Sequence, residues 1–348
     1  MRSNRTARRR WTREFESQVD GIAFGAKGPV LVHGYDPPAG GKWIEDFIPG
    51  KLAALERQTG ERLWVSPCEV GYGRGFGAGF GEEDDVVVLG PSAQGHGIAR
   101  MSLETGELIG AREIKAFDEA VVGRDVCVCV TPRRVCGILT TDMVESWVYS
   151  REGERYHMVG RAGEEVFVVY GAEQTQRQGV LRLHAETGEF LGTLVEPTLS
   201  PIHCMSVDGG ALVLVLDDIE SALPPDSLRD WLSELSLREE EDDLEPAEQG
   251  SLWLLALSPE GEPGQAPLWF EPLPGDHSPE LPDVSLGIDA GRLYVARGAL
   301  MAVRDSLTGR VLGDLTVPGL DEYVAWKMSE GAGLLAEETR LSVFEIPD

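Results

Sequence analysis

The chain has 348 residues, with 31 basic and 59 acidic side chains, and its formal net charge at pH 7 is -28. A hydrophobic content of 42% is typical of a globular chain and excludes disorder over most of its length. The apolar runs are much shorter than the roughly 20 residues that a membrane-spanning helix needs, so we expect no membrane partner. The acidity also argues against nucleic acid as a partner, because phosphate binding requires clustered Lys and Arg.

The start of the chain has the opposite charge. Residues 1–13 contain six arginines and no acidic residue, and no apolar stretch follows them as an export signal would require. The chain also has an odd number of cysteines, five. We therefore expect reduced thiols and a cytoplasmic location. We interpret residues 1–11 as a basic disordered arm that docks on the protein's own acidic surface, with a nucleic-acid-binding tail as the alternative.

A strand–turn–strand pattern recurs along the chain. The turn is often Thr-Gly, which favours a hairpin because glycine adopts a positive φ without steric cost. Each copy follows a β-rich strand, and one more short strand precedes that one. Six copies cover residues 52–64, 98–110, 135–147, 180–192, 252–269 and 300–313, and a seventh ends the chain at 331–345.

Each repeat unit therefore contains four strands, and successive units begin about 40 to 56 residues apart, with one insertion. Four-stranded units with this period predict an all-β, seven-bladed β-propeller that forms a single domain over residues 12–348. The seventh unit lacks its outer strand. We expect residues 12–18 to supply it, because this closes the ring and removes an exposed sheet edge.

The sequence of residues 52–64, Leu-Ala-Ala-Leu-Glu-Arg-Gln-Thr-Gly-Glu-Arg-Leu-Trp, is similar to the repeat of quinoprotein-like (PQQ-type) propellers. In that family a Thr-Gly turn is followed by a Trp that docks between neighbouring blades. The matching residues are Trp64, Trp147 and Trp269, while Gly110, Gly192 and Gly313 replace the Trp in other units.

The resemblance implies the propeller fold over nearly the whole chain. Enzymes of the family usually have eight blades, a bound quinone with calcium, and an adjacent pair of cysteines. This chain has seven predicted blades and no adjacent cysteines. The resemblance therefore points to the non-catalytic members, and we expect no cofactor.

Two further patterns have structural interpretations. Residues 71–81 have glycine at every odd position, which we interpret as an innermost strand packed close to the propeller axis. The alternative is a backbone surface that a ligand approaches. Cys127 and Cys129 share one face of a predicted strand, with Cys136 opposite Cys129. We interpret all three as buried apolar side chains, because zinc sites use turn-like cysteine spacing.

Four histidines are expected on one face of the propeller. His157 and His203 begin the first strands of successive blades, near the mouth of the central channel, and His96 and His277 lie in loops. An acid–base or metal site there is one interpretation. No His-x-His or Glu-x-x-His spacing supports it, so we assign no catalytic, cofactor-binding or metal-binding residue.

Residues 218–249 are predicted to form an acidic insertion inside the fifth blade, with a short amphipathic helix. Four apolar side chains share one helix face, namely Leu228, Trp231, Leu232 and Leu235. An acidic run follows at Glu239, Glu240, Glu241, Asp242 and Asp243. Either the helix packs on its own propeller, or its Trp and Leu side chains enter the groove of a partner.

These observations favour a non-catalytic protein–protein interaction propeller that acts as a scaffold or as a subunit of a larger cytoplasmic assembly. Its partner would be another protein with a basic or groove-bearing surface, attracted by the acidic one. The alternative is a small-molecule or metal-dependent enzyme or ligand-binding propeller with its site at the mouth of the central channel. That alternative predicts a deep polar pocket containing His157 and His203.

Overall fold

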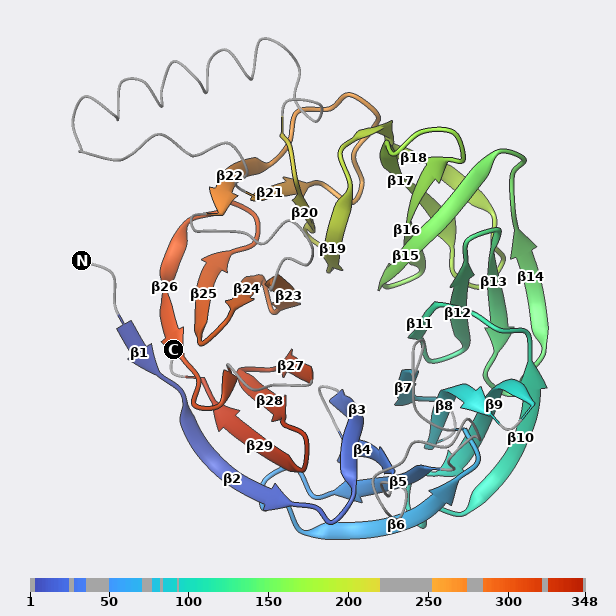
Figure 1. The fold of residues 1–348 in the computed structure, drawn as a ribbon, viewed down its shortest axis with the longest axis vertical. Helices are drawn as coiled ribbons and strands as arrows, with labels where there is room; N and C mark the ends of the chain where they lie inside the picture. Colours follow the sequence, from blue (N-terminus) through green and yellow to red (C-terminus); the bar gives the residue numbers. More distant parts are fainter. Residues whose placement is uncertain are drawn as a thin grey trace.

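The strands form seven small sheets arranged in a ring around a common axis (Figure 1). The structure is a computed structural model, and it describes residues 4–24, 28–35, 50–70, 77–81, 84–92, 94–219, 252–273, 284–320 and 325–346. Within those ranges no helix is long and apolar enough to cross a membrane. The seven sheets make the protein an all-β, seven-bladed β-propeller with four-stranded blades, as the repeat pattern predicts.

The first four blades each use four consecutive antiparallel strands, ordered from the axis outward. Blade 1 contains β3 (Gln18–Phe24), β4 (Val30–Tyr35), β5 (Gly50–Leu55) and β6 (Arg62–Cys68). Blade 2 contains β7 (Gly77–Phe80), β8 (Asp85–Ser92), β9 (Gly95–Ser102) and β10 (Leu108–Ile114). Blade 3 contains β11 (Glu119–Val122), β12 (Val126–Thr131), β13 (Arg134–Leu139) and β14 (Glu145–Tyr149). Blade 4 contains β15 (Glu154–Ala162), β16 (Glu165–Ala172), β17 (Gln178–His184) and β18 (Phe190–Leu199).

The last three blades complete the ring. Blade 5 contains β19 (Ile202–Val207), β20 (Leu212–Leu216), β21 (Leu252–Leu257) and β22 (Trp269–Leu273). Blade 6 contains β23 (Val284–Asp289), β24 (Arg292–Arg297), β25 (Leu300–Asp305) and β26 (Val311–Thr316). Blade 7 contains β27 (Ala325–Ser329), β28 (Ala332–Ala336) and β29 (Arg340–Glu345), with β2 (Arg8–Glu14) as its outer strand.

The second strand of each blade is apolar at consecutive positions because neighbouring blades cover both of its faces. In β8, for example, Val86, Val87, Val88 and Leu89 are all 0% exposed. A short continuous apolar run of this kind is typical of a strand buried on both sides. The outer strands are more exposed to solvent, and β10 has no fully buried residue. The core is therefore divided among the interfaces between blades.

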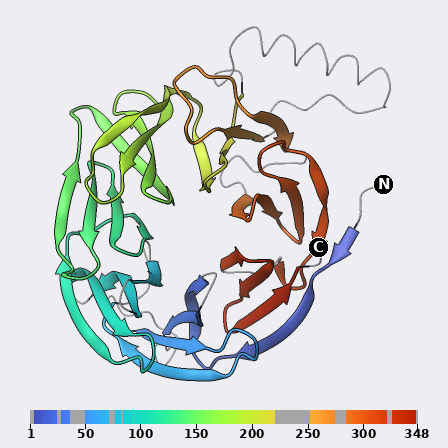
Figure 2. The same cartoon turned by 180° about the vertical axis from the view of Figure 1, so that it is seen from behind.

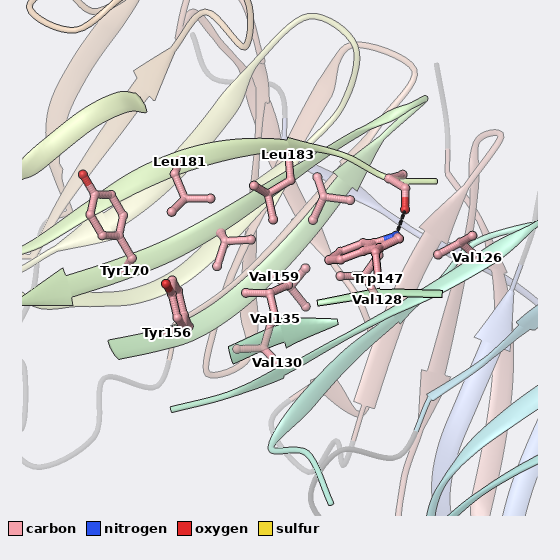
Figure 3. Packing of buried hydrophobic residues seen from close by; sticks show 13 residues of the cluster. Val126, Val128, Val130, Val135, Trp147, Tyr156, Val159, Tyr170, Leu181 and Leu183 are labelled. Carbon is pink, nitrogen blue, oxygen red and sulfur yellow. Dashed lines mark hydrogen bonds between the residues drawn. The ribbon is translucent and has the colours of Figure 1, made fainter. Parts of the chain in front are cut away.

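Figure 3 shows one of these interfaces, between blades 3 and 4. Valines of β12 and β13 pack against leucines of β17, and the indole of Trp147 lies across the gap. Tyr156 and Tyr170 close the other end of the cluster. The blades are thus joined by side-chain packing, since their sheets share no ladder hydrogen bonds here.

The N-terminal segment closes the ring by pairing with both of the last two blades (Figure 2). Strand β2 pairs antiparallel with β29, and β1 (Asn4–Thr6) pairs in parallel with β26. Closure by an N-terminal strand is confirmed, but β2 begins and ends four residues earlier than the predicted 12–18.

The expected disordered arm at residues 1–11 is corrected by the structure. From Asn4 onward, the arginines of this segment lie in strands β1 and β2. The guanidinium of Arg9 lies 5.6 Å from the ring centroid of Phe344, and Arg10 Nη2 is 3.6 Å from Glu345 Oε1. The indole of Trp11 docks on blade 1, as described below. The docking of Trp11 and the contact of Arg9 with the Phe344 ring favour residues 8–14 as the outer strand, while the exposed Arg10–Glu345 pair adds little.

The predicted acidic insertion, 218–249, lies almost entirely outside the described residues. The structure describes only Asp218 and Ile219 of it. The predicted helix face and acidic run fall outside the described part of the chain.

Candidate binding surfaces

Among the described residues, four outer strands carry a tryptophan that docks on the next blade. Trp64 on the outer strand of blade 1 donates its Nε1–H to Leu103 O of blade 2, at 2.7 Å. The indole covers Gly106, where a Cβ would lie 2.5 Å from the ring. The same geometry recurs for Trp147 and Ala185 O (2.9 Å), Trp269 and Ser306 O (2.8 Å), and Trp11 and Arg57 O (3.0 Å).

Trp64, Trp147 and Trp269 dock on the next blade, as the repeat predicts. Trp11 is a fourth docking residue that the repeat pattern missed, because no Thr-Gly turn precedes it in the sequence. In each case the turn glycine has a positive φ, for example +73° at Gly106 and +68° at Gly188. Glycine is needed there both for this conformation and for the close approach of the ring.

At two of the three glycines that replace the tryptophan, an arginine of the adjacent strand makes the link to the next blade, whereas the third, Gly313, faces Val303. In blade 2, Arg100 faces Gly110, and its Nη1 donates to Thr141 O of blade 3 at 2.7 Å. In blade 4, Arg182 faces Gly192, and its Nη1 donates to Pro259 O of blade 5 at 3.0 Å.

In each of these pairs one large side chain faces a small residue. In the blades with a docking Trp, the cross-strand partner is small, with Ala54 facing Trp64, Gly137 facing Trp147 and Ala256 facing Trp269. Arg100 is also anchored within its own blade, since its Nε lies 2.5 Å from Asp85 Oδ2. Both side chains of that ion pair are buried. The exchange therefore alternates two kinds of interblade hydrogen-bond donor around part of the ring.

A polar cavity of about 320 Å³ lies at the ends of β15, β16 and β17. Its walls include Arg155, His157, Glu173, Arg177 and Pro201. Burial, and secondarily the charge of Arg155, lower the pKa of His157. Two of the wall residues form an ion pair, with Arg155 Nη2 lying 3.4 Å from Glu173 Oε1.

The histidines expected at the channel mouth do not form one site. His203 does not line this cavity, and its Nε2 lies 2.5 Å from Asp217 Oδ1. His96 lies in β9, with its ring 4.7 Å from that of Phe117, and burial lowers its pKa. His277 is outside the described residues. Among all the residues that the structure describes, no group of three or more His, Cys, Asp or Glu is placed to hold a metal ion.

The cysteines and the glycine-rich strand have the structural roles expected of them. Cys129 and Cys136 pair directly across β12 and β13, and both join Cys127 in a buried cluster. The described end of the glycine segment is β7, the innermost strand of blade 2. A Cβ on Gly79 would lie 2.6 Å from Val122 of blade 3, so glycine allows the two inner strands to approach closely.

The rim of the propeller carries exposed apolar side chains that no sequence pattern had indicated. Several lie on the outer strands of different blades, just after the turns that join the third and fourth strands. Examples are Leu63 (54%), Leu108 (48%), Ile109 (55%), Phe190 (37%) and Leu191 (38%), while the highest exposure among the described large apolar side chains, 63%, is that of Leu300 on β25.

One part of the rim, at the start of β18, also carries aromatic rings and an arginine. The rings of Tyr149 and Phe190 are stacked, with centroids 6.1 Å apart. The guanidinium of Arg151 lies 4.1 Å from the centroid of Phe190. Partly exposed aromatic and arginine side chains in contact are the residue types that contribute most to binding at protein interfaces.

A groove of about 410 Å³ lies beside the second half of β18, between blades 4 and 5. Leu194 and Leu199 of β18 and Leu255 and Leu257 of β21 form its apolar walls, and residues 258–266 form its far side. Glu196 and Glu262 lie at its margin. The outer edge of β18 has no strand partner within the described part of the chain.

Comparisons with known proteins agree with this fold. No family model matches the chain, and no curated protein sequence matches it. Among solved structures, it is similar to hydrazine synthase of Kuenenia stuttgartiensis, with a TM-score of 0.60, 8% identity and 96% of each chain covered. It is also similar to the computationally designed Ika8 protein, with a TM-score of 0.57, 13% identity, and 97% of this chain and 100% of that one covered. At these identities the likeness shows the fold alone.

Proposed function

We propose that this chain is a non-catalytic protein–protein interaction propeller, a scaffold or subunit of a larger cytoplasmic assembly. The observation that carries the proposal is the recurrence of exposed apolar side chains on the outer strands, such as Leu63, Leu108 and Ile109. Contiguous exposed apolar residues indicate an interaction site, and Leu108 and Ile109 are neighbours on β10. The odd number of cysteines supports the location.

The partner class follows from charge. The net charge of -28 attracts a partner with a basic surface, and that attraction is screened by salt. Membership among the non-catalytic PQQ-type propellers is part of the same proposal. Its support is the docking of Trp64, Trp147 and Trp269 on the next blade.

Affinity capture from source-cell lysate at low salt tests the proposal. The full chain is compared with a variant that carries Leu108→Glu and Ile109→Glu on the rim, and with a deletion of residues 222–248. Loss of a partner from the rim variant places the interface on the outer strands, and loss from the deletion places it on the insertion. If the full chain captures no partner at low salt, the proposal fails.

A second candidate is a small-molecule site in the 320 Å³ cavity that contains His157. Arg155 and Arg177 give this cavity donors that suit a carboxylate or phosphate group. Its test is a thermal-shift screen with small anionic metabolites, comparing the full chain with His157→Ala. A stabilising compound that loses its effect in the variant would favour this function.

A further inference from the structure

The outer strand β18 has features that the other outer strands lack. It has ten residues, against five to seven for β6, β10, β14, β22 and β26. Its pairing with β17 contains three register irregularities. The 410 Å³ groove runs beside its second half, and the Tyr149–Phe190–Arg151 cluster lies at its first residue.

The chain itself shows that an outer strand of this propeller accepts another strand. β1 pairs in parallel with β26, with Asn4 opposite Asp314, Arg5 opposite Leu315 and Thr6 opposite Thr316. Ala7 N adds a hydrogen bond to Thr316 O at 3.0 Å. An extended segment that contains Arg5 therefore pairs with the backbone of an outer strand whose edge would otherwise face solvent.

We propose that the edge of β18 binds an extended, basic segment of a partner protein as an added strand. This inference rests on the proposed function and names the kind of partner. Backbone hydrogen bonds to β18 would supply affinity, as in other cases of strand addition. Because side chains of a strand alternate, every second residue of the partner enters the groove toward the partly buried Leu257.

Charge selects the remaining partner residues. Glu196 and Glu262 border the groove and are exposed, and the surrounding protein is strongly acidic. A partner segment that alternates aliphatic residues with Lys or Arg places its cations beside these carboxylates. An acidic segment with the same apolar pattern is repelled.

A library of random twelve-residue peptides displayed on phage tests the inference with the full chain. We expect enriched peptides to alternate aliphatic with basic residues and to lack proline at the centre. One enriched peptide is then synthesised and its dissociation constant is measured by fluorescence anisotropy. Hydrogen exchange with that peptide bound should slow amides of β18 and leave β10 and β14 unchanged.

Ala266→Trp blocks the groove from its exposed far side and should weaken the peptide at least about tenfold. Ala111→Trp, an exposed position on β10, is the matched control and should leave affinity unchanged. No enrichment, protection on a strand other than β18, or equal affinity of both variants would overturn the assignment. Binding that appears only after residues 222–248 are deleted would also overturn it, because the chain's own insertion would then occupy the groove.

The two proposals fail separately. If the lysate experiment captures a partner through the rim but the peptides do not protect β18, only the assignment to β18 is lost. If the peptides protect β18 but the full chain captures no cellular partner, the assignment to β18 stands. The proposed function then fails.

Discussion

Arg100 and Gly110 face each other across β9 and β10, and the arginine reaches the next blade where a tryptophan does so in blades 1, 3 and 5. The pair reverses the size distribution of Ala54 and Trp64 in blade 1. Both solutions end in an N–H that donates to a backbone carbonyl of the following blade. Interblade contact is thus maintained by two different pairs of residues.

Arg100→Ala should destabilise the protein by about 3 kcal/mol, because it leaves the buried Asp85 carboxylate without its partner. Urea unfolding at pH 7 measures the change. Adding Asp85→Asn should recover part of the loss, since it removes the unpaired charge. A double variant no more stable than Arg100→Ala would contradict this explanation.

Gly188→Ala should cost more than an ordinary glycine substitution, because the new Cβ would lie 2.5 Å from the indole of Trp147. The matched control is Gly163→Ala, at which φ is +59° and no atom lies within 4 Å of the added Cβ. The control should lose about 1 kcal/mol through its backbone conformation, and Gly188→Ala about 2 kcal/mol more. Thermal unfolding of both variants checks the difference. Equal losses of stability would show that the Trp147 indole can move away from the new Cβ without destabilising the protein.

Removal of residues 1–6 should lower the melting temperature only slightly, since it removes β1 and leaves blade 7 intact. Removal of residues 1–14 also takes away β2 and the docking of Trp11, and it exposes the edge of β29. We expect this longer deletion to unfold less cooperatively and to aggregate, which calorimetry and light scattering measure. Similar behaviour of the two deletions would argue against ring closure by β2.

Glu119 predicts a pH dependence of stability. Burial raises the pKa of its carboxyl to about 7, from an ordinary value of 4.5. The folded state then holds a proton that the unfolded state releases, so stability should fall as pH rises from 4.5 through 7. Glu119→Gln should flatten this slope and should be more stable than the original chain at pH 8, by on the order of 1–3 kcal/mol.

Urea unfolding at pH 5 and pH 8 distinguishes the two chains. Glu113→Gln, an exposed position on β10, is the control and should leave the slope unchanged. A slope that persists in Glu119→Gln would assign the titration to another group.

The fold could be predicted from the sequence because each unit repeats its own local signals. The Thr-Gly turns and the tryptophans after them recur at similar spacing, and a hairpin is a local structure. Arg100 and Arg182 each lie six residues before a turn glycine, Gly106 and Gly188, so a signal for the second kind of interblade link was present. Its meaning depends on which residue faces the arginine across the strands.

The groove along β18 could not be predicted in the same way. It depends on the path of residues 258–266 and on the register irregularities of β18, both of which result from packing between blades 4 and 5. Trp11 was missed because the strand that precedes it in its blade, β29, lies at the other end of the chain, so no Thr-Gly turn precedes it in the sequence. Periodicity describes one unit at a time, whereas these features belong to the contacts between units.

The pairing of β2 with β29 has a consequence for how the chain acquires its structure. Thr12 Oγ1 and Ser342 Oγ lie 2.9 Å apart although 330 positions separate them in sequence. Contacts of such separation form late, because the entropy of the long loop must be lost before they contribute. During synthesis β2 leaves the ribosome before the blade it completes exists, so its backbone groups stay unpaired until the seventh blade has been made. The sheet edge that closes the finished ring is therefore the one that the growing chain exposes for the longest time.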